Sequence, residues 1–212
     1  MVVPVKTYVV LDTNVWVYTT RLLSTALGAS LLYSVSRSQH SIYIPYVIEM
    51  EVRKHIAKLL REAVSQIDTG YRTVQVIMGV RDDYQVPTEN QVLARLDQRL
   101  SELGSTVVRG EFTFEDAKNA LARVIDGTPP NSERDQQFKD SAVWEELIRL
   151  ASSSQVHFVT EDKAFFKDRD PSKGLADNLR EEAAQPSGAL TPHFSLPAYL
   201  ALASVIIGGR SP

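Results

Sequence analysis

The chain has 212 residues, a length that suits one elaborated domain better than two. Hydrophobic residues make up 43% and charged residues 23%, values that exclude bulk disorder. The net charge of −3 provides no overall positive field for nucleic acid or an anionic membrane, and the lack of cysteine excludes disulfides, thiolate metal sites and a cysteine nucleophile.

We expect neither a secretory signal nor a membrane span in this sequence. The first residues lead directly into a predicted strand, without a basic segment ahead of a long apolar one, so we expect no secretory signal and a cytoplasmic protein. The apolar run 199–207 is shorter than the ~20 residues that a membrane span needs, so we expect no membrane partner.

The amino-terminal part predicts a strand, a helical region and a second strand. The β-branched run 8–11 is typical of a buried parallel strand, and it ends in the polar Asp12-Thr13-Asn14. Apolar residues recur at helical spacing over 15–37, interrupted by Gly28, which predicts one or two helices. The run 41–44 predicts the second strand.

The middle of the chain predicts helices. An apolar stripe among good helix formers over 47–67 predicts a long amphipathic helix, and a polar helix is expected at 89–103. No Gly/Ser-rich or Pro-rich linker separates this part from its neighbours. We therefore expect a single domain over 1–212, with residues 68–104 as a helical elaboration.

The remainder of the chain alternates strands with helices. Strands are expected at 106–109, 156–160 and 190–194, and helices at 113–125, 138–152 and 196–207. Such alternation implies right-handed crossovers and helices on both faces of a sheet. The sequence therefore predicts an α/β fold, a three-layer α/β/α sandwich with a mostly parallel central sheet and an additional helical middle region.

Four acidic residues occupy positions that a metal site would need. Asp12 and Asp162 follow predicted strands, and Glu51 and Asp140 stand near the starts of helices. In parallel sheets, ligands bind at the carboxyl ends of the strands. Clustered carboxylates repel one another and raise each other's pKa, so a divalent cation is expected to neutralise them, and oxygen ligands favour one or two Mg²⁺ or Mn²⁺ ions.

Neighbouring side chains extend this predicted site. Asn14 and Thr160 are expected to support the ligands, and such a site suits phosphodiester hydrolysis. Four basic residues near the acids could bind phosphate groups of the substrate, although a solvated surface explains any one of them equally well. These residues are Lys54, Lys58, Arg61 and Lys163. The four histidines lack ligand spacing, and none is assigned to catalysis.

The ligand at three of the four positions has a competitor nearby. Glu49 competes with Glu51, and since the two point about 200° apart on a helix, only one can face the sheet edge. In the same way, Glu161 competes with Asp162 and Asp135 competes with Asp140.

Four segments of the chain resemble the signature segments of PIN-domain nucleases, in the order of that family. They are VVLDTNVWVY, IPYVIEMEVRKH, QFKDSAVWEEL and HFVTEDKAFF. The last two are similar to those of larger bacterial PIN-like proteins with an extended middle region. By this resemblance the catalytic, metal-binding acids are Asp12, Glu51, Asp140 and Asp162, supported by Asn14 and Thr160.

The resemblance implies a Mg²⁺- or Mn²⁺-dependent endoribonuclease with RNA as its substrate. It leaves open a toxin paired with an antitoxin or another protein partner, an RNA-processing enzyme, and a homodimer. Two other functions also remain open. One is a small-molecule phosphohydrolase using an Asp12 phosphoenzyme, which lacks the usual second Asp because Asn14 stands there. The other is a non-catalytic module that binds RNA or protein, against which mutually repelling carboxylates argue.

Overall fold

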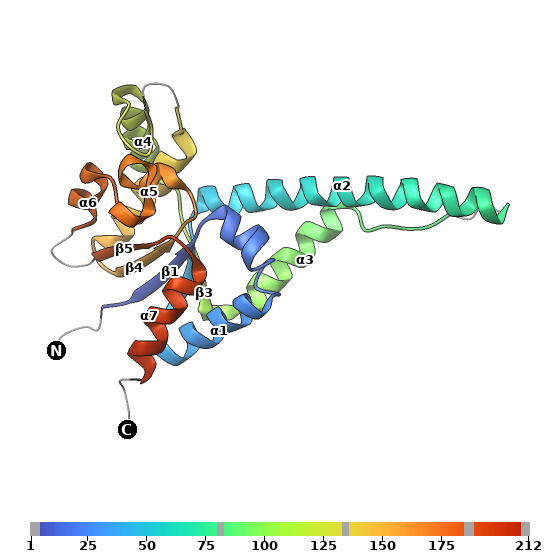
Figure 1. The fold of residues 1–212 in the computed structure, drawn as a ribbon, viewed down its shortest axis with the longest axis horizontal. Coiled ribbons are helices and arrows are strands. Elements are labelled where there is room, and N and C mark those ends of the chain that lie inside the picture. Colours follow the sequence, from blue (N-terminus) through green and yellow to red (C-terminus); the bar gives the residue numbers. More distant parts are fainter. Residues whose placement is uncertain (1–4, 80–82, 133–135, 185–188, 209–212) are drawn as a thin grey trace. The chain divides into compact units, whose positions relative to one another are not determined.

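The computed structural model describes residues 5–79, 83–132, 136–184 and 189–208. The chain forms two compact units (Figure 1). The first unit comprises Met1–Glu49 and Ser105–Pro212, and the second comprises Met50–Gly104.

A five-stranded parallel sheet forms the centre of the first unit. Its strands are β1 (Thr7–Leu11), β2 (Ser41–Ile44), β3 (Val107–Arg109), β4 (Gln155–Val159) and β5 (Ala189–His193). They lie in the order β3-β2-β1-β4-β5, and every neighbouring pair is parallel. Each strand predicted from sequence is present, with its ends shifted by one residue at most. Because β1 is central, its carboxyl end lies between those of β2 and β4.

Helices cover both faces of this sheet, which confirms the predicted three-layer α/β/α sandwich (Figure 1). α1 (Ala26–Ser38) and α7 (Leu196–Gly208) pack together on one face. On the other face, α5 (Phe138–Ala151) packs between α4 (Phe114–Asp126) and α6 (Asp177–Ala183). The short helix α6 was not predicted, because four of its seven residues are charged and its stretch resembles a polar loop.

The helical region 15–37 is interrupted at residues 21–23 and not at Gly28 as expected. A five-residue π-helix, Val15–Thr19, follows β1, and a turn with φ of 44°, 57° and 64° at Arg21, Leu22 and Leu23 precedes α1. Gly28 lies inside α1, where an added Cβ would come within 2.5 Å of the Leu23 Cα. The glycine therefore permits close packing against the turn and does not interrupt the helix.

The second unit is built from two helices. α2 (Tyr46–Met78) begins in the first unit and continues eleven residues beyond the end predicted at 67. α3 (Glu89–Glu102) starts at the residue predicted for it, and Thr88 and Gln91 form a capping box there. Within the described ranges, no helix combines the length and the apolar character needed to cross a membrane.

Candidate active site

Asp12 stands directly beyond the carboxyl end of β1. Its backbone N–H donates to the Val159 carbonyl at 2.9 Å, which continues the pairing of β1 with β4. Its carbonyl accepts the Trp16 N–H at 3.0 Å and so begins the helical turn, while Oδ1 of the side chain accepts the Thr13 N–H at 2.6 Å. Hydrogen bonds therefore fix both the backbone and the side chain of Asp12.

Thr160 connects the ends of β1 and β4. Its side chain is fully buried, and its hydroxyl donates to Asp12 Oδ2 at 2.9 Å. The oxygen of the Thr160 hydroxyl also accepts the Asp162 N–H, at 3.0 Å. One hydroxyl thus brings Asp12 and Asp162, two of the four predicted acids, to the same edge of the sheet.

Asp162 also stabilises the turn that follows it. Its Oδ1 accepts the Ala164 N–H at 2.8 Å and caps the 3₁₀ turn Lys163–Phe165, whose end is anchored by buried Phe165. The competing acid Glu161 is exposed, and its Oε1 lies 3.4 Å from the Thr19 hydroxyl. Both acids face this edge of the sheet, so the choice between them stays open.

Asp140 lies in the first turn of α5, where it is half-buried. Asn131, a residue that the sequence did not single out, fixes the start of this helix. Its side chain accepts the Gln137 N–H at 2.6 Å and donates to the Ser141 hydroxyl at 2.7 Å. Asp135, the competitor of Asp140, lies outside the described residues.

The glutamates at the start of α2 belong to different units. Glu49 is the last residue of this part of the first unit, and its Oε2 lies 3.6 Å from the Arg109 Nε, at the end of β3. Glu51 is half-buried and belongs to the second unit. Its role as a ligand stays a prediction.

The predicted phosphate-binding residues are exposed, and two of them contact acids. Arg61 binds Glu89 at 2.7 Å, and the Lys58 ammonium is 3.8 Å from Glu62. Exposed pairs of this kind contribute little and exchange readily with another anion. Lys163 directly follows Asp162, and Asn14 is exposed two residues beyond Asp12.

The donor atoms of this site suit a hard divalent cation. Asp12 and Asp162 offer carboxylate oxygens beside a hydroxyl, the chemistry that Mg²⁺ and Mn²⁺ prefer. In the described part of the chain, no group of three or more acidic or histidine side chains is close enough to hold a metal ion. The structure therefore joins Asp12 and Asp162, while the complete ligand set stays a prediction.

Glu146 is a buried acid that sequence reasoning missed. It lies on α5 with no exposed surface, accepts the Tyr43 hydroxyl at 2.8 Å on Oε1, and accepts the Tyr46 N–H at 3.1 Å on Oε2. Burial raises its pKa to about 7. The signal was its spacing, because Glu146 stands four residues after buried Ala142 on an otherwise apolar face.

A glycine makes room for this carboxylate. An added Cβ at Gly110 would lie 1.9 Å from Glu146 Oε1 and 2.6 Å from the Tyr43 hydroxyl. Nearby, Arg149 pairs with Asp116 at 3.0 Å. Burial opposes ionisation of Asp116, but hydrogen bonds from Arg149 and Thr113 outweigh it and lower the pKa of this carboxyl.

The family follows from these features and from a comparison with known proteins. A family model of the PIN domain matches residues 9–165, more than half of the chain, from β1 to the turn after Asp162. The chain belongs to the PIN-domain family. This is a nuclease-type fold, and PIN nucleases typically use divalent metal ions. No curated protein sequence matches the chain.

Proposed function

We propose that this protein is a Mg²⁺- or Mn²⁺-dependent endoribonuclease, in which carboxylates at the sheet edge support hydrolysis of phosphodiester bonds. The observation that carries the proposal is the Thr160 hydroxyl, which binds Asp12 Oδ2 and accepts the Asp162 N–H. A buried hydroxyl that orients one acid and fixes the backbone of another is typical of the surroundings of metal ligands. A cytoplasmic location, where RNA is the accessible substrate, is part of the proposal.

In this proposal Asp12 and Asp162 hold the ion, with Glu51 and Asp140 completing the ligand set. A divalent ion held by these residues would polarise a phosphoryl oxygen and lower the pKa of a water molecule. Thr160 keeps the Asp12 carboxylate in one orientation, and the exposed Lys163 ammonium binds a neighbouring phosphate of the substrate.

The test is a cleavage assay on the full chain. Purified protein is incubated with single-stranded RNA, DNA of the same sequence and a chromogenic phosphate ester, in Mn²⁺ or in EDTA. The proposal expects RNA cleavage that needs the metal and is abolished by Asp12→Asn and by Asp162→Asn. Asp126→Asn, an exposed aspartate at the end of α4, is the matched control and retains activity.

Two paired comparisons identify the ligands that the structure leaves open. Glu51→Gln and Asp162→Asn should weaken Mn²⁺ binding measured by calorimetry, whereas Glu49→Gln and Glu161→Gln should not. The reverse result would reassign the ligands within the same proposal.

Other outcomes would overturn the proposal. Turnover of the ester alone would indicate a phosphohydrolase, and tight RNA binding without cleavage would indicate a binding module. Cleavage by pure protein that survives both EDTA and Asp12→Asn would show that metal-binding acids at the sheet edge do not carry the activity.

A further inference from the structure

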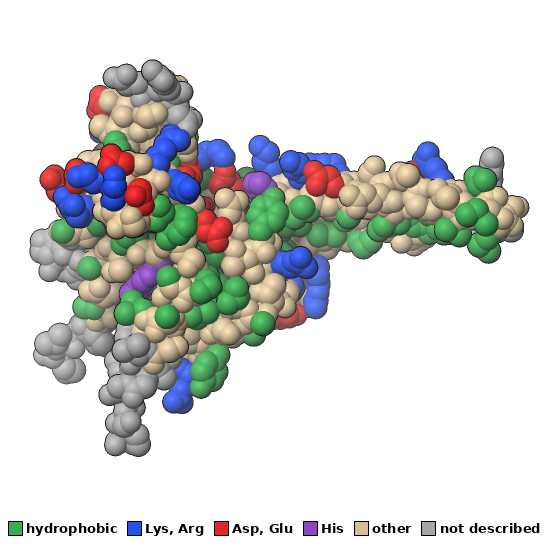
Figure 2. Space-filling view, in the orientation of Figure 1, with side chains coloured by type: hydrophobic (Ala, Val, Ile, Leu, Met, Phe, Trp, Pro, Cys, Tyr) green, Lys and Arg blue, Asp and Glu red, His purple; other side chains and the backbone are tan. Residues whose placement is uncertain are grey.

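The second half of α2 extends beyond the helix that accompanies the first half. Arg53 pairs with Asp97 and Arg61 with Glu89, so α3 runs antiparallel to α2 and begins opposite Arg61. The seventeen residues from 62 to 78 therefore reach past the start of α3. Hydrophobic side chains line this helix (Figure 2).

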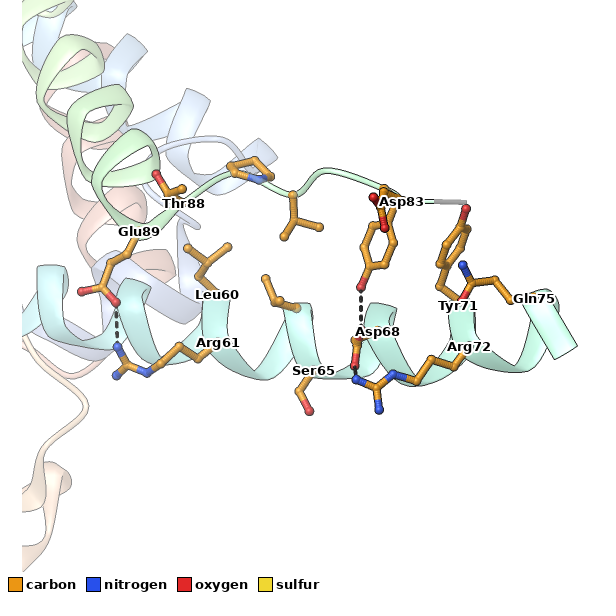
Figure 3. A pocket seen from close by; sticks show the side chains of 14 residues that line it. Leu60, Arg61, Ser65, Asp68, Tyr71, Arg72, Gln75, Asp83, Thr88 and Glu89 are labelled. Carbon is orange, nitrogen blue, oxygen red and sulfur yellow. Dashed lines mark hydrogen bonds and ion pairs between the residues drawn. The ribbon is translucent and has the colours of Figure 1, made fainter. Parts of the chain in front are cut away.

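One side of this extension is covered by the segment 83–88, which returns along it. Figure 3 shows Asp68 and Tyr71 pointing toward that segment. The Tyr84 hydroxyl donates to Asp68 at 3.3 Å, and the rings of Tyr71 and Tyr84 are 4.4 Å apart. Between helix and segment lies a groove of about 720 Å³.

A second apolar side of the extension faces solvent, and we name it the Ile67 face. It comprises Ala63, Ile67, Gly70, Val74 and Ile77. The spacing of four, three, four and three residues places them in one row along a helix, as in a coiled-coil seam. Ile67, Val74 and Ile77 are 49%, 47% and 79% exposed, and an added Cβ at Gly70 would meet nothing within 4 Å.

The composition of this segment gives it a low intrinsic helix propensity. Residues 67–77 contain Gly70, two threonines and four β-branched aliphatic residues, all of which lower helix propensity. Packing supplies most of the stability of such a helix, and the segment 83–88 packs against the extension on its groove side. A partner on the solvent-facing Ile67 face would add to that stability.

The charge of the extension selects the kind of partner. Between 63 and 79 the ionised side chains are Asp68 and Arg72, which pair with each other at 2.7 Å on the side facing the groove. The polar residues on the opposite side, such as Thr69, are neutral. This face carries no cations for RNA, and a like surface would meet it without repulsion.

The sizes of the side chains are self-complementary about Gly70. In an antiparallel pair with its two-fold axis at Gly70, Ile77 of one copy lies opposite Ala63 of the other. Ile67 then lies near Val74, and the two glycines permit close approach of the backbones. An isologous interface requires this reciprocity.

We propose that two copies of the chain associate through the Ile67 face, with their α2 helices antiparallel. The row spans about 20 Å of helix at 1.5 Å per residue. A contact confined to so short a row is small, so we expect a dimer that dissociates on dilution over roughly the micromolar range. The proposal is independent of the nuclease activity.

Sedimentation velocity of the full chain across that concentration range is the first test. The wild type should shift from monomer to dimer, and Ile67→Lys should weaken association at least tenfold. Thr69→Lys, on the opposite side of α2, is the matched control and should leave association unchanged. Circular dichroism confirms that the variants keep their helices. A wild type that stays monomeric, or a dimer insensitive to Ile67→Lys, would overturn the proposal.

Cross-linking tests the orientation, because the chain has no cysteine of its own. Ala63→Cys mixed with Ile77→Cys should give a disulfide-linked pair under mild oxidation, whereas either variant alone should not. Self-linked Ala63→Cys would contradict the antiparallel arrangement.

Discussion

The Thr160 hydroxyl donates a 2.9 Å hydrogen bond to Asp12 Oδ2, across the ends of two neighbouring parallel strands. It also accepts the Asp162 N–H, so that one side chain holds both acids. Thr160 is therefore the residue whose removal tests the site without removing a carboxylate.

Replacing Thr160 with valine should lower Mn²⁺-dependent RNA cleavage by ~10–100-fold, the usual cost of losing a partner of a metal ligand. Valine keeps the shape of the side chain but can neither donate to Asp12 nor accept from Asp162. Thr160→Ser should retain most of the activity, and Thr191→Val, on the exposed side of β5, should have no effect. Initial cleavage rates and Mn²⁺ titrations measure the change, and a fully active valine variant would contradict the prediction.

Replacing Gly110 with alanine should destabilise the fold by about 1–3 kcal/mol, the typical cost of overpacking. The added methyl group would lie 1.9 Å from Glu146 Oε1, and Glu146 is held by Tyr43 and Tyr46. Urea denaturation measures the loss. Gly70→Ala is the control, because open space and helix propensity there favour alanine by about 0.5–1 kcal/mol in the monomer. Equal effects at the two positions would contradict the prediction.

Glu146 should make the protein less stable as the pH rises toward neutrality. Burial raises the folded-state pKa of Glu146 to about 7 from its ordinary value of 4.5. Between these values the folded chain holds a proton that the unfolded chain releases, so this contribution is full below pH 4.5 and is lost as the pH rises through 7. The change amounts to at most about 3 kcal/mol.

Glu146→Gln should remove this dependence, since glutamine does not titrate. The free energy of unfolding, measured by urea titration from pH 5 to 8, should then decline less steeply than in the wild type. The comparison uses the slope, because glutamine has one acceptor oxygen where Glu146 uses two, for the Tyr43 hydroxyl and the Tyr46 N–H, so the absolute stability changes as well. An unchanged slope would count against the prediction.

His157 should have the opposite effect. Burial, together with the neighbouring His193 and His40, lowers its pKa to about 4 from 6.5. Between these values the unfolded chain binds a proton that the folded chain excludes, so stability is lost as the pH falls from 6.5 to 4. Between pH 4.5 and 6.5, where both groups act, His157 makes the free energy of unfolding rise with pH and Glu146 makes it fall. In the same urea titrations, the free energy of unfolding of His157→Gln should therefore fall more steeply as the pH rises from 5 to 6.5. A profile identical to that of the wild type would contradict the prediction.

The strands β1 to β4 could be predicted because each is a short run that contains two Val or Ile residues. The turn at Arg21, Leu22 and Leu23 could not, because no local pattern signals three left-handed residues of these types. Gly28 suggested a break at the wrong place, since its function depends on a contact with Leu23 that only the folded chain creates. The sequence also predicted too short an α2, because many of the residues after 67 are poor helix formers.

The candidate site could be predicted where its residues follow strands. The meeting of Asp12, Thr160 and Asp162 at one edge could be predicted, because the carboxyl ends of neighbouring parallel strands lie there, and their roles stay predictions. Asn131 and Glu146 were not predicted. The helical spacing of Glu146 signals its burial, but spacing does not identify the partners from other elements through which either residue acts.

The two members of the Thr160–Asp12 hydrogen bond are 148 residues apart in the chain. During synthesis, at ~5–20 residues per second, Asp12 leaves the ribosome several seconds or more before Thr160 is added. A nascent chain thus carries an unfinished edge, with β1 lacking β4 on one side. For a protein proposed to cleave RNA, this order of assembly means that the sheet edge carrying Asp12 stays incomplete until β4 and Thr160 have been synthesised.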